Sequence, residues 1–320
     1  MDALSDVLKS IHLEGAVYLN VEFTAPWCVQ SRFGLACIQE RLATAEHVMF
    51  FHFLMEGRCK MRLEGSTEAV EAGPGDMVLF PEDRAHLMGS DLHLEPIDAG
   101  TISGANATEV DFIHLRHGGG GEVTRFVCGY LACNRSVGRP LIEGLPGMLR
   151  IPVGDGPAVT PMRELLQMGV RESLEARPGG ASMLAKLSEL LFVEAMRRYV
   201  DGLPPGGNGW LAGVRDPQVG RALALLHGDP ARAWTVEVLA NEAALSRSAL
   251  AERFTALVGE PPMRYLMRWR LALAARMLRE SRETVIRIAE RSGYESEAAF
   301  NRAFKREFGM PPAGWRRAKA

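Results

Sequence analysis

The segment "FTALVGEPPMRY" (254–265) has a counterpart fifty positions later, "FKREFGMPPAGW" (304–315). Both contain a Phe, a Gly five residues on, a Pro-Pro pair and a closing aromatic residue. Ser246 and Ser296 precede the two segments where helix N-caps would stand, and Gly259 and Gly309 stand where helices would end. The repeat therefore predicts two equivalent capped helices of about 13 residues each.

The repeat extends upstream. Leu239-Ala240 matches Ile288-Ala289, and the second copy has one extra residue in its turn. A small Ala lets two short helices cross closely, as a helix-turn-helix requires. A long helix at about 263–279 would join the two units at a fixed spacing, so that both could enter major grooves about one helical turn apart. We expect an all-α domain at 216–320.

The charge is divided unevenly along the chain of 320 residues, whose net charge is −2. Residues 214–320 carry 19 Lys and Arg against 12 Asp and Glu, whereas 1–213 carry 18 against 27. A basic half beside an acidic half predicts that only the C-terminal half binds a polyanion. The alternative is a helical scaffold or adaptor without DNA, although two copies are too few for a solenoid.

Two longer stretches carry a family resemblance. "GYESEAAFNRAFKREFGMPPAGWRR" (293–317) resembles the C-terminal signature of the AraC/XylS family of bacterial transcription regulators, and "LANEAALSRSALAERFTALVGEPPMRYL" (239–266) resembles its first helix-turn-helix. The resemblance implies a double-stranded DNA operator, RNA polymerase as a partner, and activation as the mode of regulation.

The DNA-facing side chains follow from helix geometry, because positions opposite Leu250, Phe254, Phe300 and Phe304 face outward. Asn301 and Arg302 are the main candidates for base reading, since Asn pairs with adenine and Arg with guanine. Glu252 departs from the resemblance, because the family often has a basic or donor side chain there; a Glu can accept only from a cytosine amino group or pair with Arg253 or another neighbour. The full candidate set is Arg247, Ser248, Ala251, Glu252, Thr255, Glu297, Ala298, Asn301, Arg302, Lys305, Arg306 and Arg316. Of these, Arg247, Lys305, Arg306 and Arg316 are expected on phosphates, which position without specifying.

The first 150 residues read as short strands broken by Gly and Pro, in "HVMFFHFLMEGRCKMRLEG", "GDMVLFPEDRAHLM" and "HGGGGEVTRFVCGYLAC". They predict a small barrel or sandwich. The pattern resembles the cupin-type sensor domain found in a subset of the same family, which implies a small-molecule effector. The expected fold is multidomain α+β: a cupin-like β-barrel at 1–155, a helical connection and dimer interface at 156–200, a linker at 201–215, and a double helix-turn-helix.

Amphipathic segments at 160–176 and 182–200 form the helical connection. They would either make a homodimer and couple the two halves or simply pack back on the barrel.

Three residues mark the candidate effector pocket. Gly75-x5-Pro81-x-Asp83-x2-His86 resembles the second cupin motif, and His52-x3-Glu56 resembles the end of the first, with Phe50 where a His is usual. We expect His52, Glu56 and His86 either to hydrogen-bond within the barrel or to line an effector pocket, without a metal or other cofactor. A weak three-ligand metal site is the alternative, and the incomplete first motif argues against a cupin enzyme.

The five cysteines lack the paired spacing of a zinc site. Cys128 and Cys133, in "CGYLAC", would point to opposite faces of a continuous strand, so structural thiols are the preferred interpretation. A redox-responsive pair, or a metal site shared with His114 or His117, is the alternative. No apolar run is long enough to span a bilayer and the N-terminus lacks a signal-peptide pattern, so we expect no membrane partner and a cytoplasmic protein.

Overall fold

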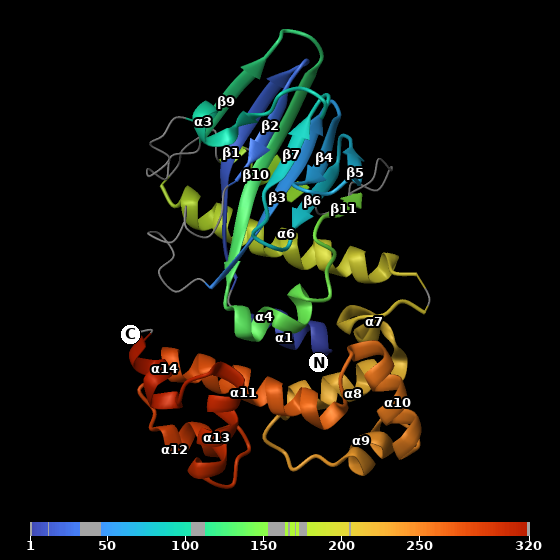
Figure 1. Cartoon of the computed structure of the whole chain (residues 1–320), viewed down its shortest axis with the longest axis vertical. Helices are drawn as coiled ribbons and strands as arrows, with labels where there is room; N and C mark the ends of the chain where they lie inside the picture. The colour runs from blue at the N-terminus through green and yellow to red at the C-terminus, as the bar shows by residue number, and fades with distance from the viewer. Residues whose placement is uncertain are drawn as a thin grey trace. The chain divides into compact units, whose positions relative to one another are not determined.

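Two β-sheets enclose the core of the N-terminal half, as the computed structural model of the chain shows (Figure 1). The structure describes residues 2–11, 13–32, 46–103, 113–152, 164–165, 167–169, 171–172, 178–204 and 206–318. The predicted helix at 160–176 lies mostly outside these residues, and Cys37 lies outside them entirely.

The larger sheet has the order β11 (Leu149–Pro152), β6 (Asp76–Phe80), β3 (His47–Glu56), β10 (Val123–Cys133), β1 (Glu14–Thr24), β9 (Ile113–Gly118). The smaller sheet has the order β5 (Ala69–Ala72), β4 (Cys59–Leu63), β7 (His86–Gly89), β2 (Cys28–Ser31), β8 (Ile97–Asp98), and the short helix α3 (Ala99–Ser103) follows β8. The predicted strands around His52, Met77, His86 and Cys128 are therefore confirmed.

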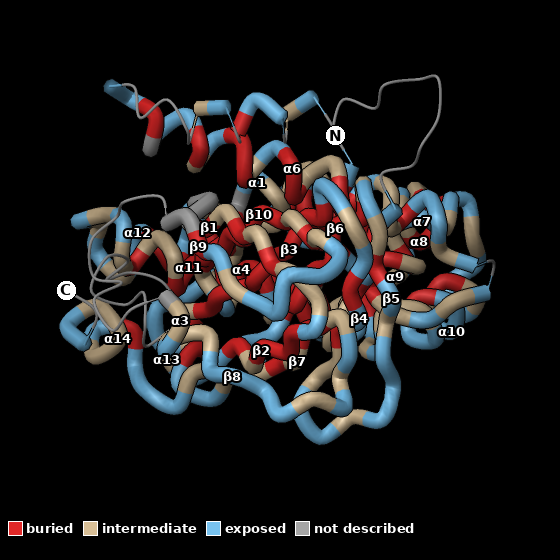
Figure 2. The backbone as a smooth tube through the Cα atoms, turned by 90° about the horizontal axis from the view of Figure 1, so that it is seen from above, coloured by how far each residue is buried: buried red, intermediate tan, exposed pale blue. Residues whose placement is uncertain are grey.

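The inward faces of the strands build the barrel core. Phe50 and Leu54 on β3 and Phe126 and Tyr130 on β10 belong to one buried cluster, because alternate residues of a strand share a face. His52 lies on the same face of β3, between Phe50 and Leu54. Buried residues are concentrated along β3, β6 and β10 (Figure 2).

The long helix α6 (Gly180–Gly202) packs on the barrel. Leu184, Leu187 and Leu191 are buried, and a Cβ added to Gly15 on β1 would lie only 2.6 Å from the Cβ of Ser188. Leu190, on another side of the helix, is 49% exposed. The buried side of the predicted amphipathic segment at 182–200 therefore packs back on the barrel.

The C-terminal half is helical, as predicted. Its helices are α7 (Trp210–Arg215), α8 (Pro217–Gly228), α9 (Val236–Glu242), α10 (Arg247–Val258), α11 (Pro262–Glu280), α12 (Val285–Arg291), α13 (Glu297–Phe308) and α14 (Pro312–Ala318). Two further helices, α1 (Ala3–Ile11) and α4 (Arg135–Ile142), group with them through contacts of α1 with α8 and of α4 with α11.

This grouping differs from the domain boundaries expected from sequence. The predicted barrel segment, 1–155, includes α1 and α4, which belong to the compact unit of the C-terminal helices. The predicted linker, 201–215, contains α7, whose Trp210 is 4% exposed and therefore part of the helical core. Gly and Pro in 201–209 marked the end of α6 correctly, but they did not reveal the short helix after it.

Candidate DNA-binding interface

Helices α10 and α13, called here the reader helices, have matching ends. The side chains of Ser246 and Ser296 accept hydrogen bonds from Ala249 N and Ala299 N, each at 3.2 Å. Gly259 and Gly309 adopt left-handed conformations, with φ of 85° and 76°, and end the helices. Both capping predictions are confirmed.

One face of each reader helix is fully buried. Leu250 and Phe254 on α10 and Phe300 and Phe304 on α13 are all 0% exposed. The closing aromatic residues of the repeat pack edge-on against these phenylalanines, with ring centroids 5.7 Å apart for Phe254–Tyr265 and 5.9 Å apart for Phe304–Trp315. The aromatic residues that the two copies share therefore pack in the interior of the helical unit.

The opposite face carries most of the candidate DNA contacts. Side chains on this face are exposed at Arg247, Ser248, Glu252, Thr255, Glu297, Ala298, Arg302, Lys305 and Arg306, and half-buried at Ala251 and Asn301. The structure thus leaves both helices a polar outer surface, and on α13 it brings Asn301, Arg302 and Lys305 to one side.

Several candidate cations also have partners within the protein. Arg247 forms an ion pair with Glu237 at 2.9 Å, but both side chains are more than half exposed, so the pair contributes little and leaves Arg247 open to phosphate. Arg306 is exposed and contacts the sulfur of Met267 at 3.3 Å.

Arg316 is placed differently from the expectation. Its guanidinium donates to the backbone carbonyl of Leu278 at 3.1 Å and to that of Glu283 at 2.5 Å. These carbonyls lie at and beyond the end of α11, where orphan acceptors need donors. The structure therefore gives Arg316 a capping role inside the domain rather than a place on the reader surface.

Glu252 is exposed on α10, and its neighbour Arg253 binds elsewhere. Arg253 donates to Asp216 at 2.6 Å, and Asp216 is the N-cap of α8. The suggested pairing of Glu252 with Arg253 is therefore not the contact that the structure forms.

The barrel contains a second polar group of interest, His52, His86 and Cys128. His52 Nδ1 lies 2.9 Å from Cys128 Sγ, and His52 Nε2 lies 2.9 Å from His86 Nε2. His86 Nδ1 lies 3.3 Å from the carbonyl of Arg84, which only accepts. Each of these three contacts has one donor and one acceptor if Cys128 donates to His52, His52 donates to His86, and His86 donates to the Arg84 carbonyl.

All three side chains are neutral in this arrangement. Burial lowers the pKa of His52 well below its usual value, with a further decrease from His86, and lowers the pKa of His86 to about 4. Burial likewise raises the pKa of the Cys128 thiol, so the thiolate that reacts with oxidants is disfavoured. Sequence reasoning missed the link between Cys128 and His52, because only the antiparallel register of β3 and β10 places them opposite each other.

Glu56 does not join this group. It lies at the exposed end of β3 and forms an ion pair with Arg125, which also binds Glu22 at 2.9 Å. The expected pocket of His52, Glu56 and His86 is therefore divided, with the two histidines inside the barrel and the carboxylate at its rim.

A small cavity adjoins His52 inside the barrel, with a volume of about 20 Å³. That volume admits about one water molecule. Its walls are mostly apolar, and they comprise Leu19, Val21, Phe23, Val29, Ser31, His52, Met88, Ala99, Leu115, Phe126 and Cys128. An effector larger than water would have to widen this space.

Cys128 and Cys133 lie five residues apart on β10, and both are buried free thiols. At about 3.3 Å per residue along a strand, their Cα atoms are too far apart for a disulfide without bending of β10. His117, the suggested additional partner, packs its ring against Phe23, and the side chain of His114 lies outside the described residues. The described residues contain no group of three or more His, Cys, Asp or Glu side chains that could hold a metal ion.

In the described part of the chain, no helix combines the length and the apolar character that crossing a membrane requires.

Comparison with known proteins matches a different family to each half of the chain. A family described as Cupin matches residues 2–201, and a family described as Helix-turn-helix domain matches residues 239–318. A protein of Streptomyces lividans named as an AraC-like transcription regulator is 35% identical, over 99% of this chain and 98% of that protein. The HTH-type transcriptional regulator AlkR of Acinetobacter baylyi is 30% identical over 99% of both chains.

Among solved structures, the DNA-binding domain of AdpA in complex with a target DNA is 33% identical. The match covers 32% of this chain and 92% of the AdpA domain, with a TM-score of 0.31.

A β-barrel of the cupin type joined to two capped reader helices defines a DNA-binding transcription regulator. This chain belongs to the family of AraC-like transcription regulators.

Proposed function

We propose that this regulator reads a two-part operator through the outer faces of α10 and α13, and that Asn301 and Arg302 supply the base contacts of the second reader. The observation that carries the proposal is the matched capping and burial of the two helices, which leaves one polar outer face on each. On α13 that face offers an amide and a guanidinium one residue apart, and these groups recognise adenine and guanine.

The proposal is tested by selecting binding sites from a random DNA library with the purified full chain. Wild type is expected to enrich a two-part site, and Asn301→Ala with Arg302→Ala to lose preference in one part, since each such contact contributes about 1–3 kcal/mol of discrimination. Arg58→Ala is a matched control, because Arg58 is an exposed barrel arginine (78% exposed) remote in sequence from the readers. Equal enrichment by wild type and the double variant would contradict the assignment.

We further propose that the barrel binds a small, largely apolar effector beside His52. The cavity there has mainly apolar walls and a few polar groups, His52, Ser31 and Cys128, and this lining composition is typical of small-molecule sites. The space of about 20 Å³ would have to widen to admit such a ligand. Such a ligand changes DNA binding only if it binds one state of the protein better than the other. Small apolar compounds that raise the unfolding temperature of wild type should do so less for Cys128→Ser, which keeps the side-chain size but changes its polarity.

We propose no enzymatic role for the barrel, in line with relatives that are named as transcription regulators. RNA polymerase is the partner expected for an activator. Incubation of the pure chain with candidate substrates should show no turnover, whereas transcription in vitro from the selected operator should rise on adding the chain. A fall in transcription would instead identify a repressor.

A homodimer through α6 is the proposed assembly. Met183 and Leu190 are 46% and 49% exposed, and residues seven apart lie on one face of a helix. A charge at Leu190 would disfavour burial of that face. Light scattering should therefore report a dimer for wild type and a monomer for Leu190→Glu, while equal masses would exclude this interface.

A further inference from the structure

Helix α4 contacts the helices that carry the readers, although it comes from the chain between strands β10 and β11. It begins directly after β10, with Asn134 as its N-cap, and it contacts α11 and α7. Val137, Leu141 and Ile142 bury the inner side of α4 within this helical unit. The helix-turn-helix family match, residues 239–318, does not include this segment, so its position needs another explanation.

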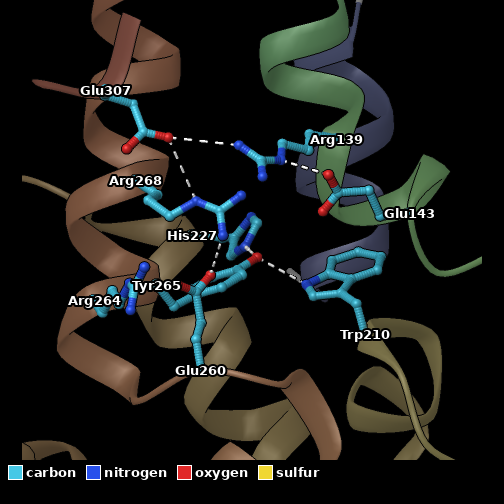
Figure 3. A network of polar contacts seen from close by, with 9 residues as sticks. All are labelled: Arg139, Glu143, Trp210, His227, Glu260, Arg264, Tyr265, Arg268 and Glu307. Atoms are coloured by element: carbon cyan, nitrogen blue, oxygen red, sulfur yellow. Dashed lines mark hydrogen bonds and ion pairs between the residues drawn. The ribbon is translucent and has the colours of Figure 1, made fainter. Parts of the chain in front are cut away.

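A chain of ion pairs links α4 to both readers (Figure 3). Arg139 of α4 lies 3.6 Å from Glu307, which is in the last turn of α13. The same carboxylate oxygen of Glu307 lies 3.6 Å from Arg268 of α11. Arg268 also binds Glu260 at 2.9 Å, and Glu260 follows the glycine that ends α10.

The network is partly shielded from water. The side chains of Glu307, Arg268 and Glu260 are 23%, 25% and 13% exposed. Arg139 is more accessible at 45%, and it also pairs with Glu143 of its own helix at 2.6 Å. The shielded part therefore joins α11 to the ends of both readers, while Arg139 adds α4 from the outside.

A cavity of about 250 Å³ lies beside these residues, lined in part by Arg139, Glu143, Trp210, Trp269 and Phe308. A contact that borders a cavity lacks packed neighbours on one side, so α4 can shift there at lower cost than inside a filled core. The contact is therefore suited to be made and released.

We propose that Arg139 is a positioning residue for the second reader: through Glu307 it holds the end of α13 against α11, and so sets the placement of one reader relative to the other. This inference rests on the proposed two-reader function. It puts a control point for DNA binding on the segment that directly follows barrel strand β10. Because Glu307 is not on the outer face of α13, the contact acts on placement and not on base reading.

The test compares three variants of the full chain. Arg139→Met keeps the apolar stem of the side chain and removes its charge. Glu307→Gln removes the charge from the other side of the same contact and also from the pair with Arg268. Glu143→Gln is the matched control, because it removes only the partner within α4, at an exposed position (59% exposed). Binding is measured to the operator selected by wild type and to a DNA that keeps only the site of the second reader.

Arg139→Met and Glu307→Gln are expected to weaken binding to the two-part operator about two- to fivefold, the range for a partly exposed ion pair. Binding to the single site should stay unchanged, because base contacts are intact. The control should match wild type on both DNAs. Equal losses on both DNAs, or equal effects of Glu143→Gln and Arg139→Met, would overturn the proposal.

Hydrogen exchange of the α13 backbone, measured without DNA, separates this inference from the proposed function. Arg139→Met should lower protection near the end of α13, whereas Glu143→Gln should not. If wild type selects no operator but the exchange difference is present, the DNA proposal fails and the contact with α13 stands. If exchange is the same in all variants, α4 does not hold α13.

Discussion

Tyr265 shows how one residue of the repeat serves the interior of the helical unit. Its hydroxyl accepts from Trp210 Nε1 at 2.7 Å and lies 2.6 Å from His227 Nε2. The tyrosine hydroxyl thus accepts from Trp210, and it donates to His227 Nε2 or accepts from it according to the histidine tautomer. The other ring nitrogen, His227 Nδ1, is buried without a hydrogen-bond partner among the described residues.

We expect Tyr265→Phe to destabilise the helical unit by about 1–3 kcal/mol, because it leaves Trp210 Nε1 and His227 Nε2 unpaired in the interior. Denaturant unfolding followed by tryptophan fluorescence measures this, since Trp27 is the only one of the five tryptophans in the barrel half. Tyr199→Phe on α6 is the control and should change stability by less than about 0.5 kcal/mol. If Tyr265→Phe leaves the free energy of unfolding unchanged, a water molecule replaces the hydroxyl.

At the scale of elements, the turns between the paired helices share a left-handed residue, and the extra residue of the second copy follows it. One residue separates Ala244 from the N-cap Ser246, and two separate Gly293 from the N-cap Ser296. Ala244 after α9 has φ of 56°, and Gly293 after α12 has φ of 75°. Both turns thus use a left-handed residue, which glycine adopts more easily than alanine. A Cβ on Gly293 would also lie 2.9 Å from the carbonyl oxygen of Ala231 and 3.0 Å from Arg270 Cζ.

The two turns should therefore respond in opposite ways. Gly293→Ala is expected to cost about 1–3 kcal/mol through backbone strain and close contacts, whereas Ala244→Gly should be neutral or stabilise by up to about 1 kcal/mol. Thermal unfolding of both variants beside wild type is the measurement. A tolerated Gly293→Ala would show that the second turn can rearrange.

Within α13, base reading and phosphate binding predict different salt behaviour. Lys305→Ala should weaken binding to all DNA sequences and lower the slope of log K against log salt by about 1. Asn301→Ala should keep the slope and lose preference at one base position. Titrations of the selected operator and of random DNA at several salt concentrations distinguish the two; a slope that falls for Asn301→Ala would assign it to phosphate.

For the whole molecule, buried histidines predict a loss of stability in mild acid. Burial lowers the pKa of His86 to about 4 and that of His227 to about 3, and the pKa of His52 is also lowered. Above the unfolded value of about 6.5, neither state binds the proton. Below it, the unfolded chain gains protons that the folded chain does not, so stability falls as pH decreases toward the folded pKa values.

Each such histidine should lower the free energy of unfolding by up to about 1.4 kcal/mol per pH unit in this window. His86→Gln should therefore flatten the dependence of barrel unfolding on pH between about 6.5 and 5. Unfolding followed at several pH values checks this. An unchanged slope would mean that His86 is protonated in the folded barrel.

The sequence alone determined the duplicated helical frame, the barrel strands and the outer faces of the readers. These features are local: caps, helix-ending glycines and the periods of helix and strand are encoded within a few residues. Leu250, Phe254, Phe300 and Phe304 were assigned to the core for that reason, and all four are fully buried.

Only the tertiary structure decided which distant groups meet. It placed Arg316 on the carbonyls of Leu278 and Glu283, separated Glu56 from the histidines, and joined Arg139 to Glu307. Each of these contacts depends on strand register or helix packing between residues far apart in sequence, and no periodicity records that information. The pattern of residues thus fixed what kind of protein this is, and packing decided how its parts are held.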